Sequence, residues 1–246
     1  MADSSFFPDT AMIFAAGFGK RMRPITNKIP KSLVKVNGKC LLDYALDNIA
    51  EAGIQKAVVN THYLAEQIEQ HLKERNKLPN VLISHEEVIL ETGGGIVKAL
   101  LRLGDKPFFT INSDVIITSG QTHLFKRMAD MWNPEIMDAL MLLQDTKKAV
   151  GYDGQGDFNL ADDGHLIKPE NDKCDYVFTG VMLIKPDIFK DMEEKPFSVY
   201  RDFLHQKYHH NDGSLSRVFG LAHDSKWLHV GTPENIKEAE KALVKS

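Results

Sequence analysis

The chain has 246 residues, of which 43% are hydrophobic and 26% charged, and its formal net charge is −4. This composition is typical of a folded globular protein and excludes a disordered or fibrous chain. The mild acidic balance gives no general reason to bind nucleic acid or a membrane, so we expect neither partner. Two cysteines, no apolar run near the roughly 20 residues that span a bilayer and no signal-peptide pattern predict a cytoplasmic protein.

Short apolar runs alternate with helically spaced apolar residues over the first half of the chain. The predicted strands are 12–16, 57–59, 81–83 and 108–111, and the predicted helices are 41–53, 64–72 and 93–103. Because βαβ crossovers place successive strands in parallel, this order predicts a mostly parallel sheet with helices on both faces. No Pro/Gly/Ser-rich linker divides the chain, so we expect one domain over 1–246.

The second half of the chain is more mixed. Strands are predicted at 139–143, 176–184 and 227–230, a helix at 199–208, and a terminal helix after the N-cap Thr232. The Gly- and Asp-rich segment 151–164 predicts turns and a small antiparallel excursion. The expected fold class is therefore α/β, a single-domain Rossmann-like arrangement.

Four polar or glycine-rich segments follow predicted strands, at 17–31, 91–95, 112–114 and 229–232. In an open parallel sheet, ligands bind beyond the carboxyl ends of the strands. The convergence of these four segments therefore predicts a binding site at that edge, although any one of them alone would be a weak signal.

The first of these segments carries glycines and several cations. Gly17 and Gly19 let the backbone approach a phosphate closely, and Arg21 and Lys31 supply positive charge for a triphosphate. Met22 stands where a dinucleotide fingerprint has its third glycine, which speaks against a nicotinamide dehydrogenase, and no Ser or Thr follows the Gly-Lys pair as in a P-loop. The segment predicts a polyphosphate cradle; the plainer interpretation is a glycine turn with solvated basic residues.

Two further segments carry groups suited to a nucleotide. Gly93, Gly94 and Gly95 stand at a predicted helix start, where exposed N–H groups would let a base or ribose lie flat against the backbone. The fourth strand ends at Asn112 and Asp114, where the carboxylate can hold Mg²⁺ and the amide can orient a hydroxyl. The plainer interpretations are a glycine contact between helix and sheet, and an aspartate that forms a turn.

Seven motifs run in order along nearly the whole chain: Gly17-x-Gly19-x-Arg21-Met22-x-Pro24-x-Thr26, Pro30-Lys31-x-Leu33-Val34, Glu91-Thr92-Gly93-Gly94-Gly95, Asn112-x-Asp114, Gly154-x-Gly156-Asp157-Phe158, Thr179-Gly180 and Val230-Gly231-Thr232-Pro233-Glu234. They resemble the signature of the sugar-1-phosphate nucleotidyltransferases, which join a sugar 1-phosphate to a nucleoside triphosphate and release pyrophosphate. The third and fifth motifs are most similar to the family's N-acetylmuramate 1-phosphate uridylyltransferases, which serve bacterial cell-wall recycling. The resemblance implies a glycosyltransferase-A-like fold without a β-helix extension.

The resemblance also implies a role for each matching residue. The catalytic residues would be Arg21, Lys31 and Asp114. The residues around the nucleotide would be Ala16, Gly17, Phe18, Gly19, Glu91, Gly93, Gly94, Gly95 and Asn112. The residues around the sugar phosphate would be Gly156, Asp157, Lys168, Glu170, Thr179 and Gly180. A solvated turn is the alternative for Lys168 and Glu170. Residues 11–115 would form the nucleotide-binding half and 116–246 the sugar-phosphate-binding half.

The last segment departs from the family pattern. Relatives commonly carry Trp-x-Asp-Val-Gly-Thr, whose aspartate is the second Mg²⁺ ligand, and this chain has His229 at that position. A neutral imidazole is a poor replacement for a carboxylate on a hard ion. Three interpretations follow: Mg²⁺ held by Asp114 with phosphates and waters, a softer ion such as Mn²⁺ that accepts His229, or an impaired site. A fourth is that His229 is an inward-pointing polar residue without a metal role.

The sequence leaves several alternatives open for the function. Within the family these are a mannose-1-phosphate guanylyltransferase or a glucose-1-phosphate thymidylyltransferase. In another class, the chain would be a catalytically impaired regulatory module that binds nucleotide sugars, as His229 suggests. The complete set of Arg21, Lys31 and Asp114 favours the enzyme. Its expected partners are a nucleoside triphosphate and a sugar 1-phosphate, in a monomer or small homo-oligomer.

Overall fold

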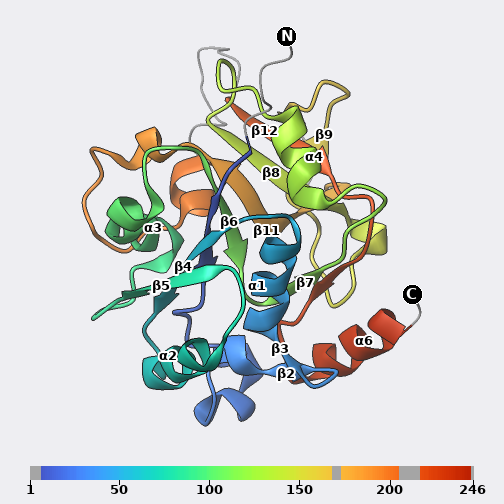
Figure 1. Ribbon diagram of the computed structural model, residues 1–246. Coiled ribbons are helices and arrows are strands. Elements are labelled where there is room, and N and C mark those ends of the chain that lie inside the picture. The colour runs from blue at the N-terminus through green and yellow to red at the C-terminus, as the bar shows by residue number, and fades with distance from the viewer. Residues whose placement is uncertain (1–6, 168–172, 205–216, 245–246) are drawn as a thin grey trace.

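Figure 1 shows the computed structural model of the chain, which describes residues 7–167, 173–204 and 217–244. A seven-stranded sheet has the order β12-β8-β11-β6-β1-β4-β5. Its strands are β1 (Thr10–Phe14), β4 (Lys56–Thr61), β5 (Asn80–His85), β6 (Phe108–Asn112), β8 (Ala139–Asp145), β11 (Tyr176–Ile184) and β12 (Val218–Ala222). β11 runs antiparallel to both of its neighbours, and the other pairings in this sheet are parallel. The predicted α/β class with a mostly parallel sheet is confirmed.

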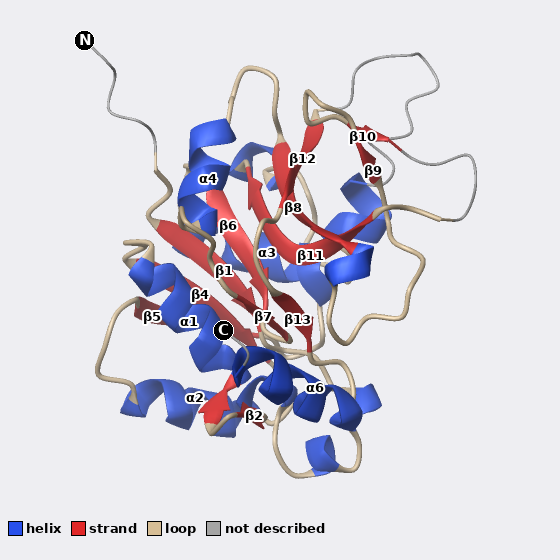
Figure 2. Ribbon diagram, turned by 90° about the vertical axis from the view of Figure 1, so that its right-hand side faces the viewer, coloured by secondary structure: helices blue, strands red, loops and turns tan. Residues whose placement is uncertain are grey.

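Helices cover both faces of the sheet (Figure 2). The helices are α1 (Leu41–Glu51), α2 (Ala65–Glu74), α3 (Glu91–Leu103), α4 (Leu124–Met131) and α6 (Pro233–Val244). Apolar residues of α1, α2 and α4 share one core with Ala11 and Ile13, whereas those of α3 share another with Met12. This division follows from the alternation of side chains along β1, which buries both of its faces.

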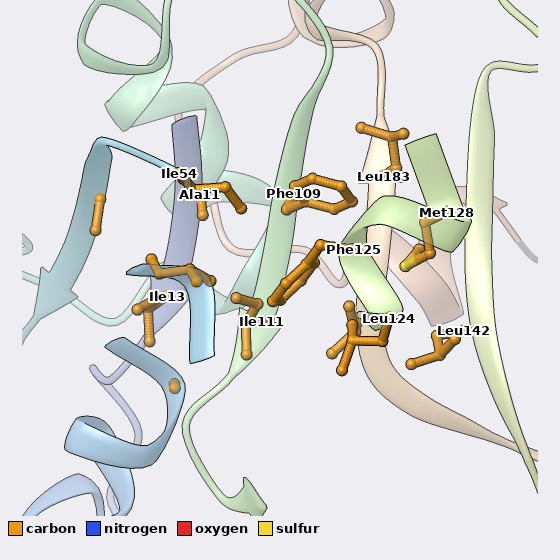
Figure 3. Packing of buried hydrophobic residues seen from close by; sticks show 14 of the residues in the cluster. Ala11, Ile13, Ile54, Phe109, Ile111, Leu124, Phe125, Met128, Leu142 and Leu183 are labelled. Carbon is orange, nitrogen blue, oxygen red and sulfur yellow. The ribbon is translucent and has the colours of Figure 1, made fainter. Parts of the chain in front are cut away.

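The first core includes a contact that sequence periodicity does not reveal. Leu124, Phe125 and Met128 of α4 pack on the sheet beside Phe109 and Ile111 (Figure 3). The rings of Phe109 and Phe125 lie 4.7 Å apart between centroids, at an interplanar angle of 60°. Such tilted pairs are favoured by the ring quadrupoles. Both α4 and β12 were absent from the elements that the sequence predicts.

Three small sheets complete the fold: β2 (Lys35–Val36) with β3 (Lys39–Cys40), β7 (Val115–Ile117) with β13 (Trp227–His229), and β9 (Asn159–Leu160) with β10 (Leu166–Ile167). The β9–β10 pair is the expected antiparallel excursion, a few residues further along the chain. β1 begins and ends two residues earlier than predicted. Of the helix predicted at 199–208, the structure describes a π-helical turn, Val199–Leu204. None of the described helices is long and apolar enough to cross a membrane.

Candidate active site

The carboxyl ends of β1 and β6 lie side by side and open into a cavity. The two strands pair in parallel, and the last pair in register joins Phe14 to Asn112. Beyond this pair lies a cavity of about 230 Å³. The residues that line it include Ala15, Ala16, Gly17, Gly19, Lys31, Asn60, Glu91, Thr92, Asn112 and Asp114. Three of the four predicted segments thus meet at one edge of the sheet.

The glycine-bearing segment folds back on itself and delivers Lys31 to this cavity. Gly19 has a φ of 59°, and a Cβ there would lie 2.9 Å from Cγ2 of Thr26 and 3.0 Å from Cβ of Lys31. The Thr26 hydroxyl donates a hydrogen bond of 2.8 Å to the Gly19 carbonyl. A hypothetical Cβ at Gly17, by contrast, meets no atom within 4 Å. Gly19 therefore permits the turn, and Gly17 leaves backbone open toward the cavity.

An ion pair joins two of the predicted catalytic residues. Lys31 Nζ donates to Asp114 Oδ2 at 2.7 Å, although the residues are 83 positions apart. Their side chains are 15% and 26% exposed, so the pair is shielded but reachable by a ligand. Burial opposes ionisation of Asp114, but the charge and hydrogen bond of Lys31, together with His229 and Arg21, outweigh it and lower the pKa of the carboxyl. Asp114 is therefore an anion held beside a cation that a phosphate could recruit.

His229 reaches Asp114 through the small β7–β13 sheet. Val115 is paired with His229, and Val230 N–H donates to the Asp114 carbonyl at 2.9 Å. The imidazole Nδ1 lies 3.1 Å from the Gly151 carbonyl, which only accepts, so Nδ1 carries the proton. Burial lowers the pKa of His229, which favours the neutral ring. Nε2 then presents its lone pair 3.8 Å from Asp114 Oδ2.

The three consecutive glycines of α3 pack against protein. Gly93 N–H donates to the Phe197 carbonyl at 2.8 Å. A Cβ at Gly93 would overlap the Phe197 ring, and one at Gly94 would overlap the Lys195 carbonyl. α3 begins at Glu91, so the glycines lie within its first turn and are buried. Gly93 and Gly94 are thus in close contact with the 195–197 segment, and Glu91 and Thr92 line the cavity.

Replacing Gly93 with alanine is expected to lower the free energy of unfolding by about 2 kcal/mol, because overpacking a tight contact costs about 1–3 kcal/mol. Equilibrium unfolding in urea measures the change. Gly17→Ala is the matched control, since a Cβ at Gly17 meets nothing within 4 Å and its φ is not positive. Equal stability of the two variants would contradict the contact with Phe197.

Residues 10–246 match the family described as nucleotidyl transferase. The N-acetylmuramate alpha-1-phosphate uridylyltransferase of Caulobacter vibrioides is 40% identical over 97% of this chain and 98% of its own length. The protein of that name from Neisseria meningitidis is 34% identical over 94% of this chain and 96% of its own. The chain belongs to the nucleotidyl transferase family. The resemblance that its motifs carry is confirmed, and the chain is an enzyme of the sugar-1-phosphate nucleotidyltransferase class.

Solved structures agree with this nucleotidyltransferase fold. HddC from Yersinia pseudotuberculosis, solved in complex with GMP-PN, matches 95% of this chain and 99% of its own with a TM-score of 0.75. The two sequences are 21% identical, so the likeness concerns the fold alone.

The residues at the centre of this nucleotidyltransferase suit a divalent ion, and the family generally uses such ions. Mg²⁺ binds proteins through one or two carboxylates, and substrate phosphates and waters complete its shell. Asp114 is a carboxylate of the kind that such an ion would need. His229 Nε2 lies 3.8 Å from Asp114 Oδ2, and imidazole suits a softer ion better than Mg²⁺.

A buried relay that sequence reasoning missed connects the two walls of the cavity. Ala15 N–H donates to Asn60 Oδ1 at 2.8 Å, and Asn60 Nδ2 donates to Glu86 Oε1 at 2.7 Å. Leu90 N–H donates to Glu86 Oε2 at 2.9 Å. Burial raises the pKa of Glu86, and these two hydrogen bonds counter it. Gly95 makes room for the carboxylate, since a Cβ there would lie 2.9 Å from Glu86 Oε1. The relay holds the β1 loop and the start of α3 at a fixed separation.

Glu86→Gln is expected to lower the free energy of unfolding by about 2 kcal/mol. The amide N–H₂ of glutamine would face one of the two buried donors, Asn60 Nδ2 or Leu90 N–H, and that hydrogen bond would be lost. The loss of a hydrogen bond to a charged acceptor costs about 1.5–3 kcal/mol. Because Glu86 holds the cavity walls, nucleotide affinity should fall as well. Urea unfolding and calorimetric titration with nucleotide measure the two effects. Glu87→Gln, next along the chain and 89% exposed, is the control. If both variants behaved alike, the relay would have no role in the pocket.

Three of the predicted sugar-phosphate residues, Gly180, Asp157 and Thr179, each contact a different part of the protein. Gly180 has a φ of 84° and makes room for Asn112, since a Cβ there would lie 2.7 Å from Asn112 Nδ2. Asp157 accepts hydrogen bonds from Phe178 N–H at 2.8 Å and Tyr200 O–H at 3.2 Å. Thr179 is fully buried and donates to the Leu142 carbonyl. In this structure Thr179 thus supports β11, and only Gly180 of the pair lies against Asn112.

The remaining predicted residues are found as follows. The φ of Gly156 is 82°, and a Cβ there would overlap the Cys174 carbonyl. The Phe18 ring packs on His62 and Tyr63, with centroid distances of 5.6 and 5.5 Å. Lys168 and Glu170 lie outside the described residues.

Arg21 and His229 line a second cavity, beside the first. This cavity of about 770 Å³ is also bounded by Gly151, Tyr152 and Thr232. Lys31 and Asp114 line the first cavity, and Asp114 Oδ2 lies 3.8 Å from Nε2 of His229, which lines the second.

Proposed function

We propose that this enzyme transfers a uridylyl group from UTP to N-acetylmuramate 1-phosphate and releases pyrophosphate. The single observation that carries the reaction type is the Lys31–Asp114 pair, which lines the cavity beyond the carboxyl ends of β1 and β6. The two curated relatives named above support the choice of substrates. We further place the reaction in the cytoplasm, in the recycling of cell-wall sugars.

In the reaction we propose, an oxygen of the sugar phosphate attacks the α-phosphorus of UTP in line. The new P–O bond forms as the α–β bridging P–O bond breaks, and its electron pair leaves with pyrophosphate. The nucleophile is already anionic, so no general base is needed, and the chain supplies position and charge. Lys31 would turn from Asp114 to the triphosphate, and Arg21 would meet it from the second cavity. Asn112 would border the nucleotide, and Gly180, which lies against it, would border the sugar.

We assign the divalent ion, Mg²⁺ or Mn²⁺, to Asp114 with His229 as a candidate second ligand. When bound, the ion would neutralise charge on the phosphates. Residues 11–115 would hold the nucleotide and residues 116–246 the sugar phosphate.

A matrix of four nucleoside triphosphates against muramyl, mannosyl, glucosyl and glucosaminyl 1-phosphates, each with Mg²⁺ and with Mn²⁺, tests the proposal by pyrophosphate release. The expected maximum is UTP with the muramyl substrate. A maximum with GTP and mannose 1-phosphate, or with dTTP and glucose 1-phosphate, would replace these substrates and keep the reaction. Nucleotide binding without pyrophosphate release in any combination would favour the regulatory module instead.

A further inference from the structure

A second group of metal-binding side chains lies away from the catalytic carboxylate, between α1 and α2. Cys40 is the residue that caps the start of α1, Asp43 lies in the first turn of α1, and His71 lies near the end of α2. One ligand atom from each, a thiol sulfur, a carboxylate oxygen and a ring nitrogen, lies within 4.8 Å of the other two. Asp43 Oδ2 and His71 Nε2 are 3.0 Å apart.

The cluster is sheltered and still reachable from solvent. Cys40 is 6% exposed, and the side chains of Asp43 and His71 are 19% and 28% exposed. Cys40 and His71 line one surface hollow, and Asp43 and His71 line the next. Cys40 is a free thiol, and no hydrogen bond to its sulfur is present among the described residues. Its sulfur is therefore available to a ligand that enters from either hollow.

A neighbouring arginine orients the carboxylate. Arg75 Nη1 donates to Asp43 Oδ1 at 3.1 Å, and its Nη2 donates to Asp47 Oδ1 at 2.6 Å. The Arg75 side chain is 4% exposed, so burial and its two hydrogen bonds hold the guanidinium group in place. Asp43 Oδ2 is left facing His71. Partners that hold the second oxygen of a ligating carboxylate are a regular feature of metal sites. Asp47 pairs with Arg75 and also with Lys39 and Lys77.

We propose that Cys40, Asp43 and His71 bind a Zn²⁺-class cation, with water as the fourth ligand. Thiolate, imidazole and carboxylate are the ligand types of tetrahedral Zn²⁺, and the thiolate discriminates against Mg²⁺. The last turn of α2 also favours positive charge through the helix dipole. On binding, the Cys40 S–H bond breaks and its proton passes to solvent, while His71 loses the Nε2 proton that faces Asp43 and takes the Nδ1–H tautomer; the sulfur and Nε2 then bond the metal. Because the thiol must lose its proton to bind the metal, affinity should rise with pH.

Cobalt(II) is the probe, because a Co²⁺–thiolate bond gives a charge-transfer absorption in the near ultraviolet that oxygen and nitrogen ligands do not. The full chain, stripped of metal and free of added thiols, is titrated with Co²⁺. The expected result is a charge-transfer band that saturates at one equivalent and is bleached by Zn²⁺. Because the ion would tie α1 to α2, Zn²⁺ should also raise the melting temperature of the chain.

Substitutions at the cluster separate this site from the catalytic one, which has no cysteine. Cys40→Ser should abolish the charge-transfer band and remain folded, since serine is a favoured helix cap. Cys174→Ser, which removes the other cysteine, should keep the band. His71→Gln should weaken Co²⁺ binding at least about tenfold. The proposal is overturned if the wild-type chain shows no band, or if the band survives Cys40→Ser and disappears with Cys174→Ser.

Discussion

Replacing Asp114 with alanine or asparagine is expected to lower kcat by about 10³-fold or more at saturating substrate, since loss of a metal's charge stabilisation costs several kcal/mol in the transition state. Asp114 is the carboxylate that this site offers to a divalent ion, and it also holds Lys31 at 2.7 Å. Asparagine keeps the size of the side chain and removes its charge. Steady-state pyrophosphate release, with Mg²⁺ and with Mn²⁺, measures the loss.

Two further measurements distinguish a chemical role from a structural one. Asp187→Asn removes an exposed carboxylate that pairs with Lys190, and it should leave kcat unchanged. The melting temperature of the Asp114 variants should fall by only a few degrees, because a single ion pair is worth little beside the whole stability. Near-normal turnover in either Asp114 variant would remove the residue from the proposed mechanism.

The fold was largely predictable where apolar periodicity is long. Helix α1 repeats apolar residues at helical spacing over eleven residues, and β4 is a continuous buried run. In helix α4, the buried residues Leu124, Phe125 and Met128 stand at helical spacing, a periodic signal that the predicted elements left out. β12 contains Gly220, where a Cβ would lie 2.7 Å from side-chain atoms of Leu143 and Leu166. The pairing of β12 with β8 is a tertiary contact that no local sequence pattern predicts.

In the site, too, local motifs identify single residues, whereas contacts between residues distant in the sequence are seen only in the structure. Lys31, Asp114 and His229 were each found from a motif, because each stands in a short segment after a strand. What the motifs could not show is that Lys31 pairs with Asp114. Nor could they show the Asn60–Glu86 relay, since each member stands alone in the sequence and acquires its role by burial. For Gly93 and Gly94, the motif could not show the contact with Phe197 and Lys195, which lie about a hundred residues further along the chain.

His229→Asp is expected to shift the metal preference of the enzyme toward Mg²⁺. Wild-type His229 faces Asp114 Oδ2 with a neutral nitrogen, which suits Mn²⁺ better than Mg²⁺. A carboxylate at position 229 would supply a second hard ligand. We expect the ratio of Mg²⁺-supported to Mn²⁺-supported kcat/KM to rise by about tenfold, the change that 1.36 kcal/mol of differential stabilisation gives.

His229→Asp should also change how the melting temperature depends on Mg²⁺, which a change of packing alone would not do. Two carboxylates beside one lysine repel each other, so the metal-free variant should melt below the wild type, and Mg²⁺ should restore it more strongly than it stabilises the wild type. His229→Asn separates the two causes, because it removes the imidazole and adds no charge. If the ratio of Mg²⁺ to Mn²⁺ activity and the Mg²⁺-dependent melting shift were alike in wild type and both variants, His229 would not be a metal ligand. Its contact with the Gly151 carbonyl would then be its whole role.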